Sequence, residues 1–401
     1  MGEVGRVDFS IHSSYDKMNR YGQERKVMMI YLDYAADTPV CQEVLKTFNE
    51  VSIKYFANPN ANHALGRVAK AYIEQTTKEI AELLNIKPEE LIYTSGATEA
   101  NNLAIKGVAE QYGRKGKHII TSYLEHSSIT GPLSYLQEKG FEVDFVRILP
   151  NGQIDLEHLK ELLRADTILA SFAAVDSELG IIQDLKAIKE VLKAAPNCLL
   201  HVDATQAIGK VDVNLDCIDL MTFTAHKLYG IHGIGALVKK EKIYLTPVIH
   251  GGLSTTAFRS GTPTLALIAS MKKALELALS GQNAAYEKVS SLNKQIREAL
   301  TPYPEILINS DEKVASPYIL NISLKGIKAS TMQQKLEEKE IYISTKSACV
   351  TPNTPSRPVL ALSNDRKRAL STLRISLSHL TTQDEVNTFV EAFKACYEEM
   401  K

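Results

Sequence analysis

Short apolar runs alternate with helix-length segments from about residue 63 to residue 240. Between Leu65 and Leu84 the apolar positions follow helical spacing, which predicts an amphipathic helix that ends before Pro88. The short runs that come after it have the length of buried strands and span residues 119–120, 141–146, 167–174, 198–202, 218–223 and 235–238. This alternation predicts an α/β fold built on a doubly wound, mostly parallel sheet that helices cover.

The last third of the chain predicts a second, smaller α/β domain. Apolar residues at helical spacing over 267–300 indicate a long linking helix. Strand-like runs follow near residues 318–324, 341–344 and 373–377, and a terminal helix begins at Thr382. A chain of 401 residues also exceeds what one hydrophobic core usually serves.

These patterns suggest domain boundaries. We expect a large domain over residues 44–265 and a small domain formed by 30–43 together with 266–401. Residues 1–29 are mostly polar and show no period, so we expect a disordered or accessory extension. This extension lacks the apolar core of a signal peptide. Nowhere in the chain does an apolar run approach the roughly 18 residues of a transmembrane helix.

Composition narrows the classes of function. Hydrophobic residues make up 44% of the chain and charged residues 23%, as in ordinary soluble globular proteins. A net charge of −1 gives no electrostatic reason to expect nucleic acid or an anionic membrane as a partner. The five cysteines are odd in number and lack CxxC spacing, which argues against a disulfide framework and a zinc site. We therefore expect a cytoplasmic protein without a bound metal.

Polar clusters follow the ends of several predicted strands. There are four of them: Tyr123–His126, Asp176–Glu178, Asp203–Gln206 and Thr224–Lys227. In open α/β sheets, ligands bind at the carboxyl ends of the strands. We therefore expect the four clusters to meet at one edge of the sheet and form a binding site.

Asp203 and Lys227 suggest the chemistry of that site. A lysine directly after a buried strand is costly unless it has a task, because an unpaired ammonium resists desolvation. Pyridoxal 5′-phosphate (PLP) enzymes use a lysine to form a Schiff base with the cofactor aldehyde. They use a carboxylate to keep the pyridine nitrogen protonated, so that the ring accepts electrons. The structural alternative is an exposed lysine and a helix-capping aspartate.

Further residues are candidates for holding such a cofactor. The run Thr94–Glu99, which includes Ala97 and Thr98, joins a predicted strand to a helix and is typical of a phosphate site at a helix N-terminus. By itself this signal is weak, because many strand–helix turns use Gly and Ser. Thr224 and His226 flank the lysine and are expected to add donors.

Side chains at the other strand ends would contact the cofactor ring. A lone histidine is more often structural, but the place of His126 after a predicted strand favours one that stacks on the ring and moves protons. Gln206 would reach the phenolic oxygen from the strand end of Asp203. The remaining histidines, among them His118 and His232, are expected at the surface or in loops.

The second domain carries two more candidate residues. Arg374 stands in an otherwise apolar strand, where a guanidinium can clamp an amino-acid carboxylate. A structural salt bridge is the alternative explanation for it. Cys349 lies in a polar, proline-rich loop rather than a buried run, and Lys346 nearby favours its thiolate.

Together these residues resemble the NifS-like cysteine desulfurases, which are fold-type I PLP enzymes of the class V aminotransferase group. The resemblance runs from Tyr31 to about the C-terminus. Its ordered motifs are Tyr31–Ala36, Asn58-Pro59 with His63 and Gly66, Thr94–Asn102, Glu125-His126, His201–Gln206, Ala225–Lys227, His250–Gly252, Arg259–Thr262, Ser347–Cys349 and Arg374.

The resemblance implies an activity and a role for each candidate. L-Cysteine would be converted to L-alanine, and its sulfur would form a persulfide on Cys349 before moving to an acceptor protein. That sulfur would serve iron–sulfur clusters, a thio-cofactor or tRNA thiolation. The implied cofactor contacts come from Lys227, Asp203, Gln206, His126, Ala97, Thr98, Thr224, His226 and Ser177, with Thr262 reaching across from the other subunit of a homodimer. Arg374 would bind the substrate carboxylate.

The chain also departs from the family pattern. Asp37 replaces a threonine near the expected substrate entrance, and Ser177 replaces the second of two asparagines. Leu253 stands where a third glycine is expected, and Lys346 precedes Ser347 in the cysteine loop. Two alternatives therefore stay open. One is another PLP activity on the same scaffold, such as a selenocysteine lyase or a class V aminotransferase, and the other is a diverged homologue that acts as a partner protein.

Overall fold

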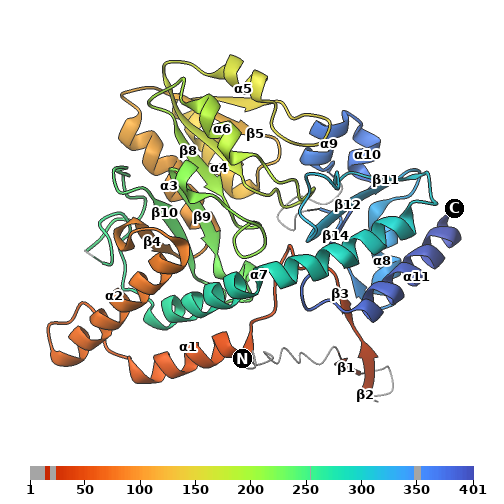
Figure 1. The fold of residues 1–401 in the computed structure, drawn as a ribbon, viewed down its shortest axis with the longest axis horizontal. Helices are drawn as coiled ribbons and strands as arrows, with labels where there is room; N and C mark the ends of the chain where they lie inside the picture. Colours follow the sequence, from red (N-terminus) through yellow and green to blue (C-terminus); the bar gives the residue numbers. More distant parts are fainter. Residues whose placement is uncertain (1–13, 19–23, 253, 347–353) are drawn as a thin grey trace.

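A seven-stranded sheet dominates this computed structural model, which describes residues 14–18, 24–252, 254–346 and 354–401 (Figure 1). The strand order is β4-β10-β9-β8-β7-β5-β6. Pairing is parallel from β6 through β5, β7 and β8 to β9, whereas β10 runs antiparallel to both β9 and β4. The sheet is therefore mostly parallel, as predicted. Its strands are β4 (Leu91–Thr94), β5 (His118–Ser122), β6 (Glu142–Val146), β7 (Thr167–Ala173), β8 (Leu199–Asp203), β9 (Leu220–Thr224) and β10 (Gly235–Lys239).

Alternate side chains along these strands enter different cores on the two faces of the sheet. In β4, Leu91 and Tyr93 join one apolar cluster, and Ile92 joins the other. Because both faces are apolar, helices must cover both. Helices α3 (Ala97–Tyr112) and α4 (Ser127–Glu138) cover the face of Ile92. Residues of α1 (Gln42–Lys54), α2 (Ala64–Leu84), α5 (Leu156–Leu162) and α6 (Leu185–Leu192) join the apolar cluster on the other face.

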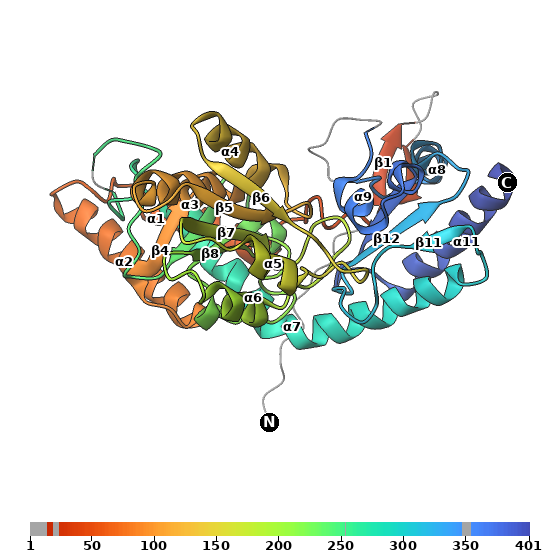
Figure 2. The same ribbon diagram turned by 90° about the horizontal axis from the view of Figure 1, so that it is seen from above.

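A single long helix, α7 (Leu265–Leu300), joins the two units of the molecule (Figures 1 and 2). Its first half places Ile268 and Leu275 in the core of the large sheet. Its second half places Leu292 and Ile296 in a separate core. The linking helix predicted over 267–300 is therefore confirmed.

The second core belongs to a smaller α/β unit. Strand β12 (Ile319–Leu324) pairs antiparallel with both β11 (Ile306–Ile308) and β14 (Thr372–Ser376). The helices of this unit are α8 (Ala329–Glu337), α9 (Arg357–Ser363), α10 (Arg366–Leu370) and α11 (Gln383–Met400).

The segment before α1 belongs mainly to this smaller unit. Strand β3 (Ile30–Tyr31) pairs in parallel with β13 (Ile341–Tyr342), and Ile30 lies in the small core. Before it, β1 (Ser14–Met18) and β2 (Glu24–Met28) form an antiparallel hairpin. These ten residues therefore form a paired hairpin within the expected disordered or accessory extension. Backbone hydrogen bonds can pair two strands even where apolar and polar side chains do not alternate. The spacing of apolar residues therefore did not reveal this hairpin.

None of the helices in the described ranges combines the length and the apolar composition needed to cross a membrane.

Candidate active site

A cavity of about 380 Å³ lies at the carboxyl ends of the central strands. All four of the predicted strand-end clusters contribute to this region, as expected from the parallel order of the sheet. The predicted site residues in its lining are Ala97, Thr98, His126, Ser177, Asp203, Gln206, Thr224, His226, Lys227 and Arg374.

Two predicted residues are not in that lining. Thr262 is exposed and does not line the cavity of its own chain. Cys349 lies outside the described residues. Lys346, which precedes that segment, is buried, and its ammonium donates to the carbonyl and hydroxyl oxygens of Thr354 at 2.8 and 2.7 Å. This contact ties together the two residues that flank positions 347–353.

Asp203 ends strand β8 with its carboxylate in the cavity. Both carboxylate oxygens accept hydrogen bonds: Oδ1 from the backbone N–H of Thr205 at 3.0 Å, and Oδ2 from Nδ2 of Asn101 at 2.8 Å. Asn101 is fully buried and also donates to the Ser128 hydroxyl at 2.9 Å. It fixes the carboxylate, and the strand-end analysis missed it. One signal for Asn101 was its place in α3, four residues after Ala97 and so on the same helix face.

His126 caps the start of α4 and lines the cavity. Its Nδ1 accepts a hydrogen bond from the backbone N–H of Ser128 at 3.2 Å. The ring proton therefore belongs on Nε2. Burial lowers the pKa of His126, which keeps the imidazole neutral near pH 7.

The N-terminus of α3 forms one end of the cavity. Gly96 caps the helix with a φ of +155°, a conformation that side-chain-bearing residues rarely adopt, and no side chain caps the first turn. Thr224 and His226 face the same end and are hydrogen-bonded to each other at 3.1 Å. Free helix N–H groups beside a hydroxyl and an imidazole suit an anion such as a phosphate.

Lys227 ends the short 3₁₀ turn η3 (Ala225–Lys227) that follows β9. Its ammonium donates to the carbonyl oxygens of Ala35, at 2.8 Å, and of Ala36. Both alanines line the cavity and come from the segment after β3. Gln206 donates from Nε2 to the same Ala35 oxygen at 2.8 Å.

Arg374 reaches the cavity from β14 and is almost fully buried. Its Nη2 pairs with Oδ1 of Asp33 at 2.8 Å, and its Nη1 donates to the carbonyl oxygen of Ser177 at 2.8 Å. Within the described chain, Nε of Arg374 has no hydrogen-bond partner. The alternative explanation, a salt bridge, is thus present, and the arginine also lines the cavity in which the predicted clamp would act.

His232 is exposed and lies in a turn, as expected, and it also contacts the site. Its ring stacks on His226 with centroids 4.9 Å apart, and its Nε2 lies 3.0 Å from Oδ2 of Asp37. It also lines the cavity. The unusual Asp37 therefore has a partner on the cavity rim. His118 corrects the expectation of a surface or loop histidine, since it is fully buried in β5 and bonded to Thr167 at 2.7 Å.

Two buried acids lie close to the cavity. Burial raises the pKa of Glu125 to about 8, although the Ser122 hydroxyl donates to it at 2.7 Å. Burial also raises the pKa of Asp176 to about 6, because three backbone N–H groups offset only part of the desolvation. Asp176 thus folds the loop that carries Ser177.

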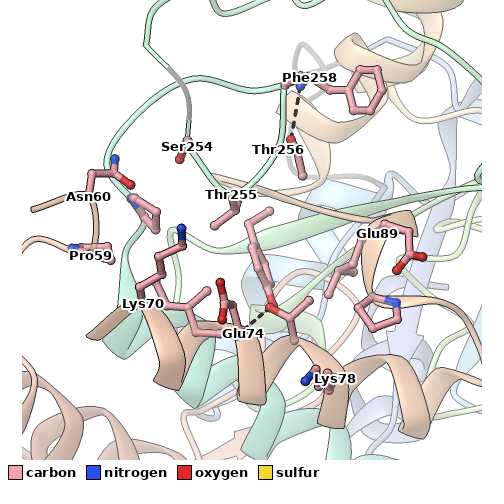
Figure 3. A pocket seen from close by; sticks show the side chains of 17 residues that line it. Pro59, Asn60, Lys70, Glu74, Lys78, Glu89, Ser254, Thr255, Thr256 and Phe258 are labelled. Atoms are coloured by element: carbon pink, nitrogen blue, oxygen red, sulfur yellow. Dashed lines mark hydrogen bonds between the residues drawn. The ribbon is translucent and has the colours of Figure 1, made fainter. Parts of the chain in front are cut away.

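A second cavity, of about 620 Å³, is larger but contains none of the predicted site residues (Figure 3). Lys70 and Glu74 of α2 point toward the segment of Ser254, Thr255 and Thr256. This second cavity lacks the strand-end groups described above, so the size of a cavity alone does not identify the active site.

The family model for Aminotransferase class-V matches residues 30–389. The chain belongs to this family. It is 38% identical over 375 residues to a NifS/IcsS protein homolog of Lactobacillus delbrueckii subsp. bulgaricus, covering 92% of this chain and 97% of that protein. It is also 38% identical over 375 residues to cysteine desulfurase IscS of Neisseria meningitidis serogroup C, covering 91% of each chain.

Two solved structures share the fold. A NifS-like protein superposes with a TM-score of 0.86 at 31% identity, covering 93% of this chain and 99% of that one. SspA in complex with cysteine superposes with a TM-score of 0.77 at 31% identity, covering 88% of this chain and 100% of that one. The relatives confirm the expected α/β fold class and place the chain among the cysteine desulfurases.

Proposed function

We propose that this class-V enzyme uses PLP to take sulfur from L-cysteine, leaving L-alanine, and passes the sulfur through Cys349 to an acceptor protein. The observation that carries the proposal is that Asp203, Lys227 and the N-terminus of α3 line one cavity together with Arg374. Enzymes of this family depend on PLP, and the relatives named IscS are cysteine desulfurases.

The groups around the cavity fit PLP from one end to the other. The free first turn of α3, with Thr98, Thr224 and His226, would hold the phosphate. Asp203, held by Asn101, would pair with the pyridinium nitrogen. Neutral His126 would lie on the ring, Gln206 and Ser177 would face its oxygen, and Lys227 would bind the aldehyde.

The substrate would enter with its carboxylate on Arg374. The unpartnered Nε and the two Nη atoms offer a donor set for two carboxylate oxygens. When bound, PLP supplies an electron sink for negative charge on the substrate carbon. Lys227 lies where it can hold and move a proton, because its ammonium already faces the carbonyl groups that line the cavity.

The sulfur step requires a thiolate from the same chain. Cys349 attacks the sulfur of L-cysteine, an S–S bond forms, and the C–S bond breaks. The electron pair of the broken bond stays on the substrate carbon, which takes up a proton to give L-alanine. The products are one alanine and one enzyme persulfide, so no external oxidant is needed. A later acceptor thiol takes the outer sulfur for iron–sulfur cluster assembly or thiolation.

The proposal includes a homodimer. Several large apolar side chains near the start of α2 are exposed, among them Phe56 at 77% and Leu65 at 55%. Surface patches of this kind commonly mark protein–protein contacts. A second subunit would bring its exposed Thr262 toward the open phosphate end of the cavity, where Thr98 is also exposed.

We further infer a cytoplasmic location. The four cysteines that the structure describes, Cys41, Cys198, Cys217 and Cys396, form no disulfide. Free buried thiols are usual in a reducing compartment.

The test compares purified wild-type protein with Lys227→Ala and Cys349→Ala. We expect wild type with PLP to show a visible cofactor band and to release alanine from L-cysteine, with sulfide released when a reductant is added. Lys227→Ala should lose the covalent band, and Cys349→Ala should keep the band but lose turnover. A wild type that binds PLP without producing alanine from L-cysteine would contradict the proposed substrate.

A further inference from the structure

Lys210 is a buried lysine next to the proposed cofactor pocket that the reaction described above does not use. Only 7% of the residue is exposed, and in the described part of the chain no carboxylate lies within 4 Å of its ammonium. Burial, with the nearby charges of Lys227 and Arg374, lowers its pKa to about 7. A buried amine without a counter-ion is costly, so a specific contact must offset that cost.

The hydrogen-bond contact of Lys210 is with Gln206, which lines the cavity. Nζ of Lys210 donates to Oε1 of Gln206 at 2.9 Å. Across the other side of the amide, Nε2 of Gln206 donates to the carbonyl oxygen of Ala35 at 2.8 Å. The Ala35 carbonyl oxygen can only accept, and Lys210 in its charged form can only donate. The two neighbours therefore allow only one orientation of the Gln206 amide.

This orientation links Lys210 to the proposed catalytic lysine. The Ala35 carbonyl oxygen also accepts from Nζ of Lys227 at 2.8 Å. A row of hydrogen bonds thus runs from Lys210 through Gln206 to the carbonyl group that Lys227 contacts. The positive charge of Lys210, which lies beside Oε1 of Gln206, also polarises the amide and makes its N–H groups stronger donors.

We propose that Lys210 is a positioning residue for the cofactor: it holds the Gln206 amide with Nε2 toward the cavity, where the N–H that is not bonded to Ala35 donates to an anionic oxygen of PLP. This inference rests on the proposed function. Without Lys210, Oε1 of Gln206 loses its donor and the Ala35 carbonyl oxygen alone holds the amide, so the N–H that faces the anion is placed less firmly and is a weaker donor.

The test is a double-mutant cycle with Lys210→Met and Gln206→Leu, which remove the ammonium and the amide while keeping similar volume. Two quantities are measured on each protein: the dissociation constant of PLP at fixed pH, and the pH midpoint of the visible band of the bound cofactor. We expect each single variant to weaken PLP binding about tenfold, or about 1.4 kcal/mol. We expect each to raise the pH midpoint, because the anionic oxygen loses a donor.

The double variant decides between positioning and a merely structural role. If Lys210 acts through Gln206, Lys210→Met has no further effect on either quantity in the Gln206→Leu background. Additive effects would overturn the proposal, because they would mean that Lys210 acts independently of the amide. Urea unfolding of each protein without PLP tests whether a variant has simply lost its fold.

The same measurements separate this inference from the proposed function. A wild type that binds no PLP contradicts both. Suppose instead that wild type binds PLP and desulfurates cysteine, and that Lys210→Met has the same PLP dissociation constant and pH midpoint. This result contradicts only the role of Lys210 and leaves the proposed function standing.

Discussion

Arg374 shows at the residue scale how a buried charge serves both stability and function. The residue is 1% exposed, and its guanidinium is held by Asp33 and by the Ser177 carbonyl group. The Ser344 hydroxyl donates to the other oxygen of Asp33 at 2.8 Å and fixes that carboxylate. The arginine is thus oriented before any substrate arrives, which lowers the entropy cost of binding.

Replacing Arg374 with lysine tests this orientation. Lysine keeps the charge but cannot form two parallel hydrogen bonds. We expect Arg374→Lys to raise the KM for L-cysteine at least about tenfold, equivalent to about 1.4 kcal/mol, with a smaller change in kcat. Steady-state alanine formation measures both constants. An unchanged KM would show that the substrate carboxylate binds elsewhere.

Glu125 provides a second prediction at this scale, one that concerns stability and pH. Its raised folded-state pKa of about 8 means that the folded protein keeps a proton that the unfolded chain releases at its ordinary value of 4.5. Stability therefore falls as pH rises between those two values and levels off above about 8. Glu125→Gln mimics the protonated acid and should remove this loss.

Urea unfolding of the two proteins at pH 6.5 and pH 8 measures the effect. We expect wild type to lose at least about 1 kcal/mol relative to Glu125→Gln over this interval. The exposed control Glu138→Gln should follow wild type at both pH values. A constant difference between wild type and Glu125→Gln would contradict the prediction.

At the scale of elements, the start of α3 depends on its contact with β10. Gly96 precedes the helix, and Gly235 begins the strand beside it. A Cβ atom on Gly235 would lie 2.7 Å from the Cα atom of Gly96, which is too close for any side chain. The absence of a side chain at Gly235 thus sets the position of the helix N-terminus that would hold the cofactor phosphate.

Gly235→Ala should therefore move the phosphate end of the cavity. We expect a loss of about 1–3 kcal/mol in the free energy of unfolding, because the clash is with backbone atoms. We also expect the dissociation constant of PLP to rise at least about tenfold. Gly281→Ala in α7 is the matched control, since its Cβ atom meets nothing within 4 Å. That control should leave PLP binding unchanged, and equal PLP binding by both variants would contradict the argument.

At the scale of the whole molecule, α7 connects two separate cores and the cavity receives residues from both units. Asp203 comes from β8 of the large sheet and Lys227 from the turn after β9, whereas Arg374 comes from β14 of the small sheet. The exposed Thr262 and the exposed apolar residues around α2 suggest that the working assembly also includes a second chain.

Phe56→Asp tests this assembly. A charge in the centre of an apolar contact is poorly tolerated, so we expect the variant to sediment as a 44.3 kDa monomer and wild type as a dimer. The monomer should also bind PLP less tightly, because it lacks Thr262 from the partner. Leu149→Asp, on an exposed loop, is the control and should remain dimeric. A dimeric Phe56→Asp protein would place the interface elsewhere.

Local patterns in the sequence predicted the elements and much of the site. Apolar spacing identified α2 and α7, and the positions of polar residues after strands identified Asp203 and Lys227. This works because strand ends of a parallel sheet always share one edge, so sequence order translates directly into position. The hairpin of β1 and β2 was missed because its residues have no apolar period.

Only the tertiary structure decided which distant residues touch. Asn101 with Asp203, Asp33 with Arg374, and Asp37 with His232 join residues that are far apart in the chain. Lys210 contacts Gln206, which is only 4 residues away in the chain, but the spacing of apolar residues did not predict that Lys210 is buried. Periodicity reports which face of an element is apolar, whereas a pairing between elements depends on how those faces pack. The sequence by itself thus determined the elements and the chemistry at the strand ends, and packing decided the partners that orient them.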